Sequence, residues 1–198
     1  VRGVEAVLPV PNGIAVVADN TWRAKKGMEA LNLQFQGGKT LGLDSQQVRM
    51  ELVAVLDNQG KARIEADQVL DLEYEVPFLA HSTLEPMNCT AHVTEKFCEV
   101  WAPTQNQGMS MSVAKEITEL NEKQILIHTT MLGGGFGRRS ETDYVTQAVS
   151  LSKLLGKPVQ VTWMREEDMQ HDFYRPVSMS RFQIGLGKEG FPLQWKNQ

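Results

Sequence analysis

The segment TTMLGGGFGRRSETDY, residues 129–144, holds four glycines within five positions, and this cluster restricts the fold more than any other feature. Each glycine in an ordered segment costs about 0.5–1 kcal/mol relative to alanine, so the cluster must answer a steric requirement. A strand-like run, residues 124–132, precedes it, and an alternating run, residues 158–164, comes later. Between them, a helical stripe is formed by Tyr144, Ala148, Leu151 and Leu155. We expect a strand, glycine loop, helix, strand crossover with parallel strands.

The glycine loop is typical of an anion site. A glycine-rich turn between strand and helix leaves N–H groups unpaired at the positive end of the helix dipole. Arg138 and Arg139 follow it, and their guanidinium groups suit phosphate oxygens. The alternative is a tight turn that needs positive φ angles, with both arginines solvated. A dinucleotide motif starting at Gly133 would need glycine where Arg138 stands, and the P-loop lysine is missing, so the residues alone predict only an anionic, phosphorylated ligand held by backbone.

The composition is that of an ordinary globular protein, with 41% hydrophobic and 22% charged residues among 198, so a disordered or fibrous chain is disfavoured. A net charge of −4 argues against a nucleic-acid or anionic-membrane partner. No run approaches the roughly 20 apolar residues of a membrane span, so no membrane-spanning helix is predicted. The chain starts at Val1 in mid-pattern and stops at FPLQWKNQ, which indicates a fragment. A sheet cut in this way would expose edges that allow the fragment to self-associate.

No metal held by protein side chains is expected. Cys89 and Cys98 lack zinc-site spacing and are interpreted as free, inert thiols. The histidines show no paired spacing and are interpreted as structural; they are His81, His92, His128 and His171. The run MREEDM, ending at Met169, is interpreted as a solvated helix start.

The chain divides into three stretches. Residues 1–38 contain a hairpin and then a helix capped by Thr21, and residues 39–68 read as a connector with one weak apolar run. From residue 69 onward, alternating segments predict antiparallel strands, a helix over residues 108–120 and a terminal strand, turn, strand. Ser140 and Asp143 resemble a capping box for the helix after the glycines, which Gly156 and Pro158 end.

Four segments together carry a family resemblance: MLGGGFGRR, AVSLSKLLGKPVQVTWMREEDM, LEYEVPFLAHSTLEPMNCTAHV and CEVWAPTQ. In this order they resemble the molybdopterin-binding subunit of the xanthine dehydrogenase and aldehyde oxidase family. The Gly-Gly-Gly-Phe-Gly-Arg-Arg form with Leu-Glu-Pro-Met-Asn is most similar to the isoquinoline 1-oxidoreductase beta-subunit branch. The likeness covers nearly the whole chain.

The resemblance implies a mixed α/β, or α+β, fold. Residues 1–38 would end a small hammerhead-type α/β domain, and residues 69–198 would form an incomplete first molybdopterin-binding domain. The parent would be a molybdenum hydroxylase that inserts water-derived oxygen into an N-heterocycle or aldehyde, with molybdopterin in its cytosine dinucleotide form. Electrons would pass to an iron–sulfur small subunit. The fragment alone is expected to be inactive and without cofactor.

The resemblance also assigns residues to the cofactor site. Its cofactor-binding loop corresponds to Gly133, Gly134, Gly135, Phe136, Gly137 and Arg138. The backbone of Phe136 would face the metal, while its side chain is as readily explained by packing. The family's catalytic glutamate would lie outside this chain, and Glu141 is better explained as a first-turn helix residue.

Two departures from the family pattern restrict the function. Gly137-Arg138-Arg139-Ser140 replaces the Gly-Gly-Lys-Glu of many xanthine-type relatives, which disfavours purine hydroxylation. Leu79 replaces a glutamine that contacts the metal's oxo group in such relatives. A second reading therefore stays open, in which the chain is a non-catalytic module that binds an anionic cofactor or assists assembly on the same fold.

Overall fold

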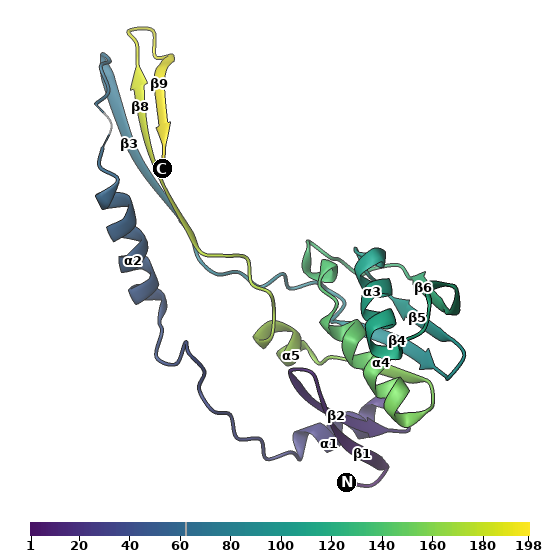
Figure 1. The fold of residues 1–198 in the computed structure, drawn as a ribbon. Coiled ribbons are helices and arrows are strands. Elements are labelled where there is room, and N and C mark those ends of the chain that lie inside the picture. The colour runs from purple at the N-terminus through teal and green to yellow at the C-terminus, as the bar shows by residue number, and fades with distance from the viewer. Residues whose placement is uncertain (62) are drawn as a thin grey trace. The chain divides into compact units, whose positions relative to one another are not determined.

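A computed structural model describes residues 1–61 and 63–198 (Figure 1). The chain forms two compact units. Unit 1 comprises Val1–Leu33 and Ala80–Phe173, and unit 2 comprises Gln34–Leu79 and Tyr174–Gln198. The structure confirms the predicted mixed α+β class, whereas the predicted domain boundaries stay a prediction.

Unit 1 begins with a hairpin and a short helix. Strands β1 (Val4–Val10) and β2 (Gly13–Ala18) pair antiparallel, as the Pro-Asn-Gly turn predicts. Helix α1 (Thr21–Glu29) packs closely on the hairpin, because a methyl group at Gly27 would lie only 2.6 Å from Cγ1 of Val16. The predicted cap is wrong by one position: Asn20, not Thr21, accepts the hydrogen bond from the Arg23 amide.

The core of unit 1 is a four-stranded sheet in the order β6-β5-β4-β7. Its strands are β4 (Asn88–Val93), β5 (Cys98–Ala102), β6 (Ile125–Thr129) and β7 (Val159–Thr162). Strand β5 is parallel to β6, and β4 is antiparallel to both β5 and β7. Strands β6 and β7 therefore run in the same direction, as predicted, but two other strands separate them.

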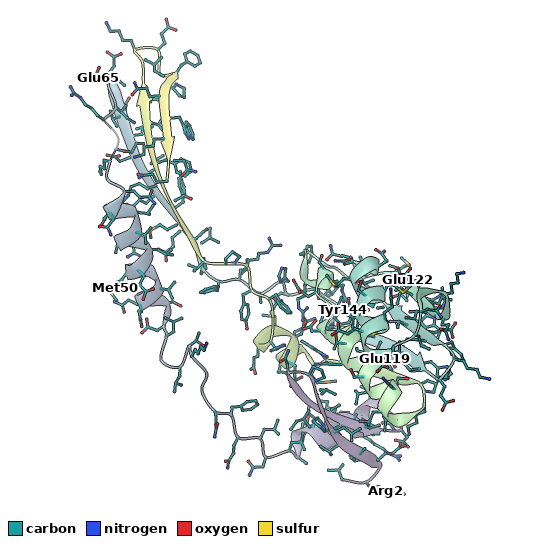
Figure 2. The ribbon with its side chains drawn as sticks, in the orientation of Figure 1. Arg2, Met50, Glu65, Glu119, Glu122 and Tyr144 are labelled. Atoms are coloured by element: carbon teal, nitrogen blue, oxygen red, sulfur yellow. The ribbon has the colours of Figure 1, made fainter. Side chains whose placement is uncertain are left out.

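Helices α3 (Gln107–Thr118) and α4 (Asp143–Leu155) contact this sheet and each other (Figure 1). Alternate residues of β4 and β5 are fully buried, and this period-2 pattern is what places an apolar face under the helices. Tyr144, labelled in Figure 2, is fully buried in this core, and its hydroxyl donates to the carbonyl of Pro103 at 3.4 Å. Unit 1 also contains the short helices η1 (Glu122–Gln124), η2 (Arg138–Ser140) and α5 (Arg165–Gln170).

Helix α4 follows the predicted stripe but not the predicted start. Tyr144, Ala148 and Leu151 are buried, and Gly156 ends the helix with a φ of 63°. The predicted capping box is wrong, because Ser140 lies in η2 and α4 begins at Asp143 without a side-chain cap. The glycine loop enters a one-turn 3-10 helix first, which displaces the start of α4.

Unit 2 is a three-stranded antiparallel sheet with one helix. Its strands β3 (Gln68–Val76), β8 (Ser178–Leu186) and β9 (Pro192–Asn197) lie in the order β3-β8-β9. The terminal strand, turn, strand is confirmed, but β3 pairs with β8, more than a hundred residues later, and not with β4. Helix α2 (Ser45–Asn58) occupies the stretch interpreted as a connector, and Asp44 caps it by accepting from the Gln47 amide.

In the part of the chain that the structure describes, no helix combines the length and apolar character needed to cross a membrane.

Candidate functional site

The glycine loop, residues 133–137, links the region after β6 to η2, and its backbone is unusual. Gly134 and Gly137 have φ angles of 98° and 104°, which favour glycine strongly. Phe136 has a φ of 53°, although it carries a side chain, and it is 63% exposed. Strained backbone conformations of this kind cluster at functional sites, where the surrounding structure holds them in place.

The other two glycines are required by close packing. A methyl group at Gly133 would lie 2.5 Å from Cβ of Glu85, and one at Gly135 would lie 2.4 Å from Oε1 of Gln105. Real Cβ atoms do not approach so closely, so Gly133 must be bare, whereas a methyl group at Gly135 would require the end of the Gln105 side chain to move. The steric requirement expected from the sequence is therefore met by two positive φ angles and two contacts with the protein itself.

Only part of the loop's backbone is open to a ligand. The expectation of unpaired amides is wrong for Gly133, which donates to Oε2 of Glu85 at 2.8 Å, and for Gly137, which donates to Oε1 of Gln105 at 3.1 Å. The Arg138 amide bonds to the Gly135 carbonyl. Within residues 1–61 and 63–198, the amides of Gly134 and Gly135 have no protein acceptor. Gly135 is buried, and a buried N–H without a partner is rare enough to indicate a missing acceptor.

Arg139 ties the loop to the segment before β4. Its side chain is completely buried, and Nη2 donates to the Glu85 carbonyl at 2.7 Å and to the Glu85 carboxylate at 2.9 Å. Nε donates to the Gly134 carbonyl at 2.8 Å, and Nη1 to that of Pro103 at 3.4 Å. One guanidinium thus fixes the loop, the Glu85 segment and the end of β5 together.

Arg138 faces a different set of partners. Its two Nη atoms donate to both oxygens of Asp143 at 3.0 and 2.8 Å, a bidentate pair at the start of α4. Its Nε lies 3.0 Å from Oδ1 of Asp172, in a geometry that makes an ion pair but not a hydrogen bond. The guanidinium also lies over the rings of Trp163 and Phe173, at 5.4 and 5.3 Å. Burial alone would lower the pKa of Arg138, but Asp143 and Asp172 reverse this and raise it, so the side chain stays charged.

Both arginines were expected to offer their guanidinium groups to phosphate, or to be solvated. The structure shows neither, because both side chains are buried and occupied by carboxylates of the same chain. Any contact of Arg138 with a cofactor would therefore come from its support of the loop and not from a free fork. The sequence gives one clue to these carboxylate partners, since Asp143 follows Arg138 by five residues. Asp172 and Glu85 are too distant in the sequence to be recognised as partners.

The remaining acidic candidates differ from expectation. Glu141 is exposed and lies before α4, so the first-turn interpretation is wrong. Asp168 is buried and paired with Arg165 at 3.0 Å, so the interpretation of its segment as a solvated helix start is wrong there, although α5 does begin at Arg165. Burial raises the pKa of Asp168, and the positive charges of Arg165 and Arg138 oppose this.

The cysteines are free, as expected, and both are buried. Burial raises the pKa of both thiols, that of Cys98 to about 11, so neither is a thiolate near neutral pH. Among the described residues, no cluster of three side chains suited to a metal ion is present. Leu79, at the departure from the family pattern, belongs to unit 2, where it exchanges backbone hydrogen bonds with Arg175.

The loop fits the anionic group that the resemblance implies. Two neighbouring amides without acceptors, one of them buried, lie on a backbone that protein contacts hold on both sides. The carboxylate of Glu85, which contacts the loop, accepts hydrogen bonds from Arg139, Asn88 and Gly133, so its charge is already compensated beside these donors. Donors of this kind stabilise negative charge.

Comparison with known proteins gives the family. Residues 39–195 match the molybdopterin cofactor-binding domain family. The membrane-bound aldehyde dehydrogenase (pyrroloquinoline-quinone) of Gluconacetobacter polyoxogenes is 28% identical over 190 residues, which are 89% of this chain and 25% of that protein. Isoquinoline 1-oxidoreductase subunit beta of Brevundimonas diminuta is 27% identical over 213 residues, covering 94% of this chain and 26% of that protein.

The fold is shared with a solved enzyme. The Cu,Mo-CO dehydrogenase, in its carbon monoxide reduced state, matches 100% of this chain and 33% of its own with a TM-score of 0.73 and 18% identity. The chain spans about a quarter of the length of the two curated relatives. Since the match extends over most of the chain and includes the glycine loop, the chain belongs to the molybdopterin cofactor-binding domain family, among molybdopterin-binding subunits of the xanthine dehydrogenase type.

Proposed function

We propose that this chain is the part of a molybdenum hydroxylase large subunit that holds the molybdopterin cofactor at the glycine loop. The observation that carries the proposal is the pair of acceptor-free amides at Gly134 and Gly135, the second of them buried. An oxygen of the bound cofactor would accept from these two donors. Phe136 follows these two glycines, and its positive φ turns the backbone at this point of the loop.

The chain's own residues position the cofactor and do not react. When bound, the cofactor would supply the metal that activates water-derived oxygen and receives two electrons. Arg139 and Glu85 hold one end of the loop, and Gln105 holds the other through the Gly137 amide. Because these groups are in place before binding, the donors need no reorganisation to meet developing negative charge. The catalytic glutamate is expected in a part of the parent outside these residues.

The substrate class follows from the relatives and from one feature of the loop. Names of relatives mention aldehyde, isoquinoline and nicotinate, so we propose an aldehyde or N-heterocycle substrate. A purine is disfavoured, since Arg139 and Ser140 stand where xanthine-type relatives have Lys-Glu, and neither offers a carboxylate. We further propose the cytosine dinucleotide form of the cofactor and electron transfer to an iron–sulfur small subunit.

The test uses the intact parent polypeptide, purified from cells that make the molybdenum cofactor. We expect equal amounts of molybdenum, measured by mass spectrometry, and of pterin, measured by fluorescence after denaturation and oxidation. Turnover of isoquinoline or an aromatic aldehyde in ¹⁸O-labelled water should place the label in the product. A folded parent with neither molybdenum nor pterin would refute the proposal. Pterin without turnover of any aldehyde or heterocycle would favour the non-catalytic binding module instead.

A further inference from the structure

His81 has a ring that the protein holds rigidly. Its backbone amide donates to Oδ2 of Asp172 at 2.6 Å, and its ring Nδ1 lies 3.0 Å from both oxygens of the same carboxylate. The side chains are 10% and 2% exposed, so this contact is nearly dry. An ionised carboxylate only accepts hydrogen bonds, so Nδ1 carries the hydrogen in this pair.

Asp172 is itself fixed by the charged interior. Its Oδ1 lies 3.0 Å from Nε of Arg138, and Arg138 is bound on its other side by both oxygens of Asp143. A continuous set of contacts therefore runs from the start of α4 through Arg138 to His81. The orientation of the imidazole depends on the same arginine that follows the glycine loop.

The free edge of the ring faces the glycine loop. A methyl group at Gly137 would lie 3.6 Å from Nε2 of His81 and 4.0 Å from Cδ2. Because Gly137 has no side chain, no side-chain atom of that residue covers the nitrogen. Across the described ranges of the chain, no protein group forms a hydrogen bond with Nε2. A purely structural histidine would need only the amide and Nδ1, and would gain nothing from an Nε2 placed without a partner beside this loop.

We propose that His81 is a cofactor-binding residue, whose Nε2 accepts a hydrogen bond from the ligand held at the glycine loop, with Asp172 and Arg138 as positioning residues. This inference rests on the proposed function. In the tautomer with its hydrogen on Nδ1, an imidazole presents a lone pair at Nε2. The loop then offers two donors, the amides of Gly134 and Gly135, and one acceptor. That pattern suits a group with an anionic oxygen beside an N–H or O–H, as in a phosphorylated pterin.

Two substitutions at this position separate a binding role from a structural one. In His81→Asn, the side-chain amide reaches the place of Nδ1 and keeps the bond to Asp172, but nothing replaces Nε2. In His81→Gln, the amide reaches the place of Nε2, and the bond to Asp172 is lost. A binding role predicts that the asparagine variant loses the cofactor and the glutamine variant keeps it, whereas a structural role predicts the reverse.

The measurement is the rate at which molybdenum and pterin leave the purified parent polypeptide after dilution, followed by gel filtration and metal analysis. We expect about tenfold faster loss from His81→Asn, the effect of one lost hydrogen bond worth about 1.4 kcal/mol, and a rate within about threefold of wild type for His81→Gln. Thermal unfolding of the cofactor-free forms provides the control for folding.

The outcomes are distinguishable. Loaded wild type with an equally retentive His81→Asn variant overturns this inference and leaves the proposed function intact. A wild-type parent that lacks molybdenum and pterin overturns the proposed function, and this inference with it. If His81→Asn does not fold, His81→Gln decides alone: a folded variant that retains the cofactor supports the binding role, and one that loses it overturns it.

Discussion

The buried guanidinium of Arg139 should be the main support of the glycine loop, and replacing Arg139 with methionine tests this. Methionine keeps most of the apolar length of the side chain but removes every hydrogen bond. The substitution leaves the carbonyl of Gly134 without its donor and removes one donor each from the carbonyl and the carboxylate of Glu85. The perturbation therefore removes one charge and several contacts at a single buried point.

The magnitude follows from those contacts. Breaking a buried ion pair by removing one partner costs about 3–5 kcal/mol. The side chain of Glu85 is 35% exposed, so water compensates part of its charge and the lower end applies. We expect the free energy of unfolding of unit 1 to fall by about 3 kcal/mol. At a typical dependence of this free energy on urea of about 2 kcal/mol per M, the urea midpoint falls by roughly 1.5 M.

The assay is urea unfolding followed by tryptophan fluorescence in a Trp195→Phe background. The remaining reporters, Trp22, Trp101 and Trp163, then all lie in unit 1. Arg23→Met is the matched control, because Arg23 makes an exposed ion pair with Asp19 and should cost less than about 1 kcal/mol. The free energies of unfolding of the two variants are then compared. If they differ by less than about 1 kcal/mol, which is close to the uncertainty of the extrapolation, the buried arginine does not anchor the loop and our reasoning is refuted.

Further predictions concern the loop and the thiols. Gly135→Ala should displace Gln105, because the new methyl group would collide with its Oε1, and the cofactor content of the parent should fall. In the control, Gly38→Ala, the new methyl group would meet no atom within 4 Å, so the cofactor content should not change. Equal loss of cofactor from both variants would contradict the packing argument. Cys98 should resist iodoacetamide at pH 8 in the folded chain and react on unfolding, since burial raises its pKa to about 11. Since the folded pKa lies above the unfolded value near 9, the thiol's contribution to stability is complete below pH 9 and is lost as the pH rises toward 11. Unfolding titrations at pH 8 and 10.5 should show this fall, and Cys98→Ser should reduce it; an unchanged difference would assign the fall to other groups.

Local patterns in the sequence predicted the elements of this fold well. The hairpin, the apolar stripe of α4 and its end at Gly156 all depend on neighbours within a few residues, which periodicity and turn chemistry describe. The family was predicted from the order of four segments and is confirmed by the match over residues 39–195. Helix α2 was missed because most of its side chains are exposed, so it lacks a strong apolar stripe.

What the sequence could not predict depends on contacts between distant segments. The pairing of β3 with β8 joins strands whose hydrophobic patterns would equally fit other partners. The burial of Arg138 depends on Asp172, 34 positions later by the numbering of the two residues, and the orientation of the His81 ring depends on the same carboxylate. An arginine next to glycines has the same local appearance whether it meets a phosphate or an aspartate of its own chain.

Arg138 and Arg139 are neighbours in the chain but bind opposite sets of carboxylates, Asp143 with Asp172 on one side and Glu85 on the other. The glycine loop, which directly precedes both arginines, has therefore lost its conformational freedom once folding is complete. Ligand capture then carries little further entropic penalty, and the fold can mature before any pterin arrives. Insertion of the cofactor would accordingly be a late step of assembly, into a receptor that is ready to receive it.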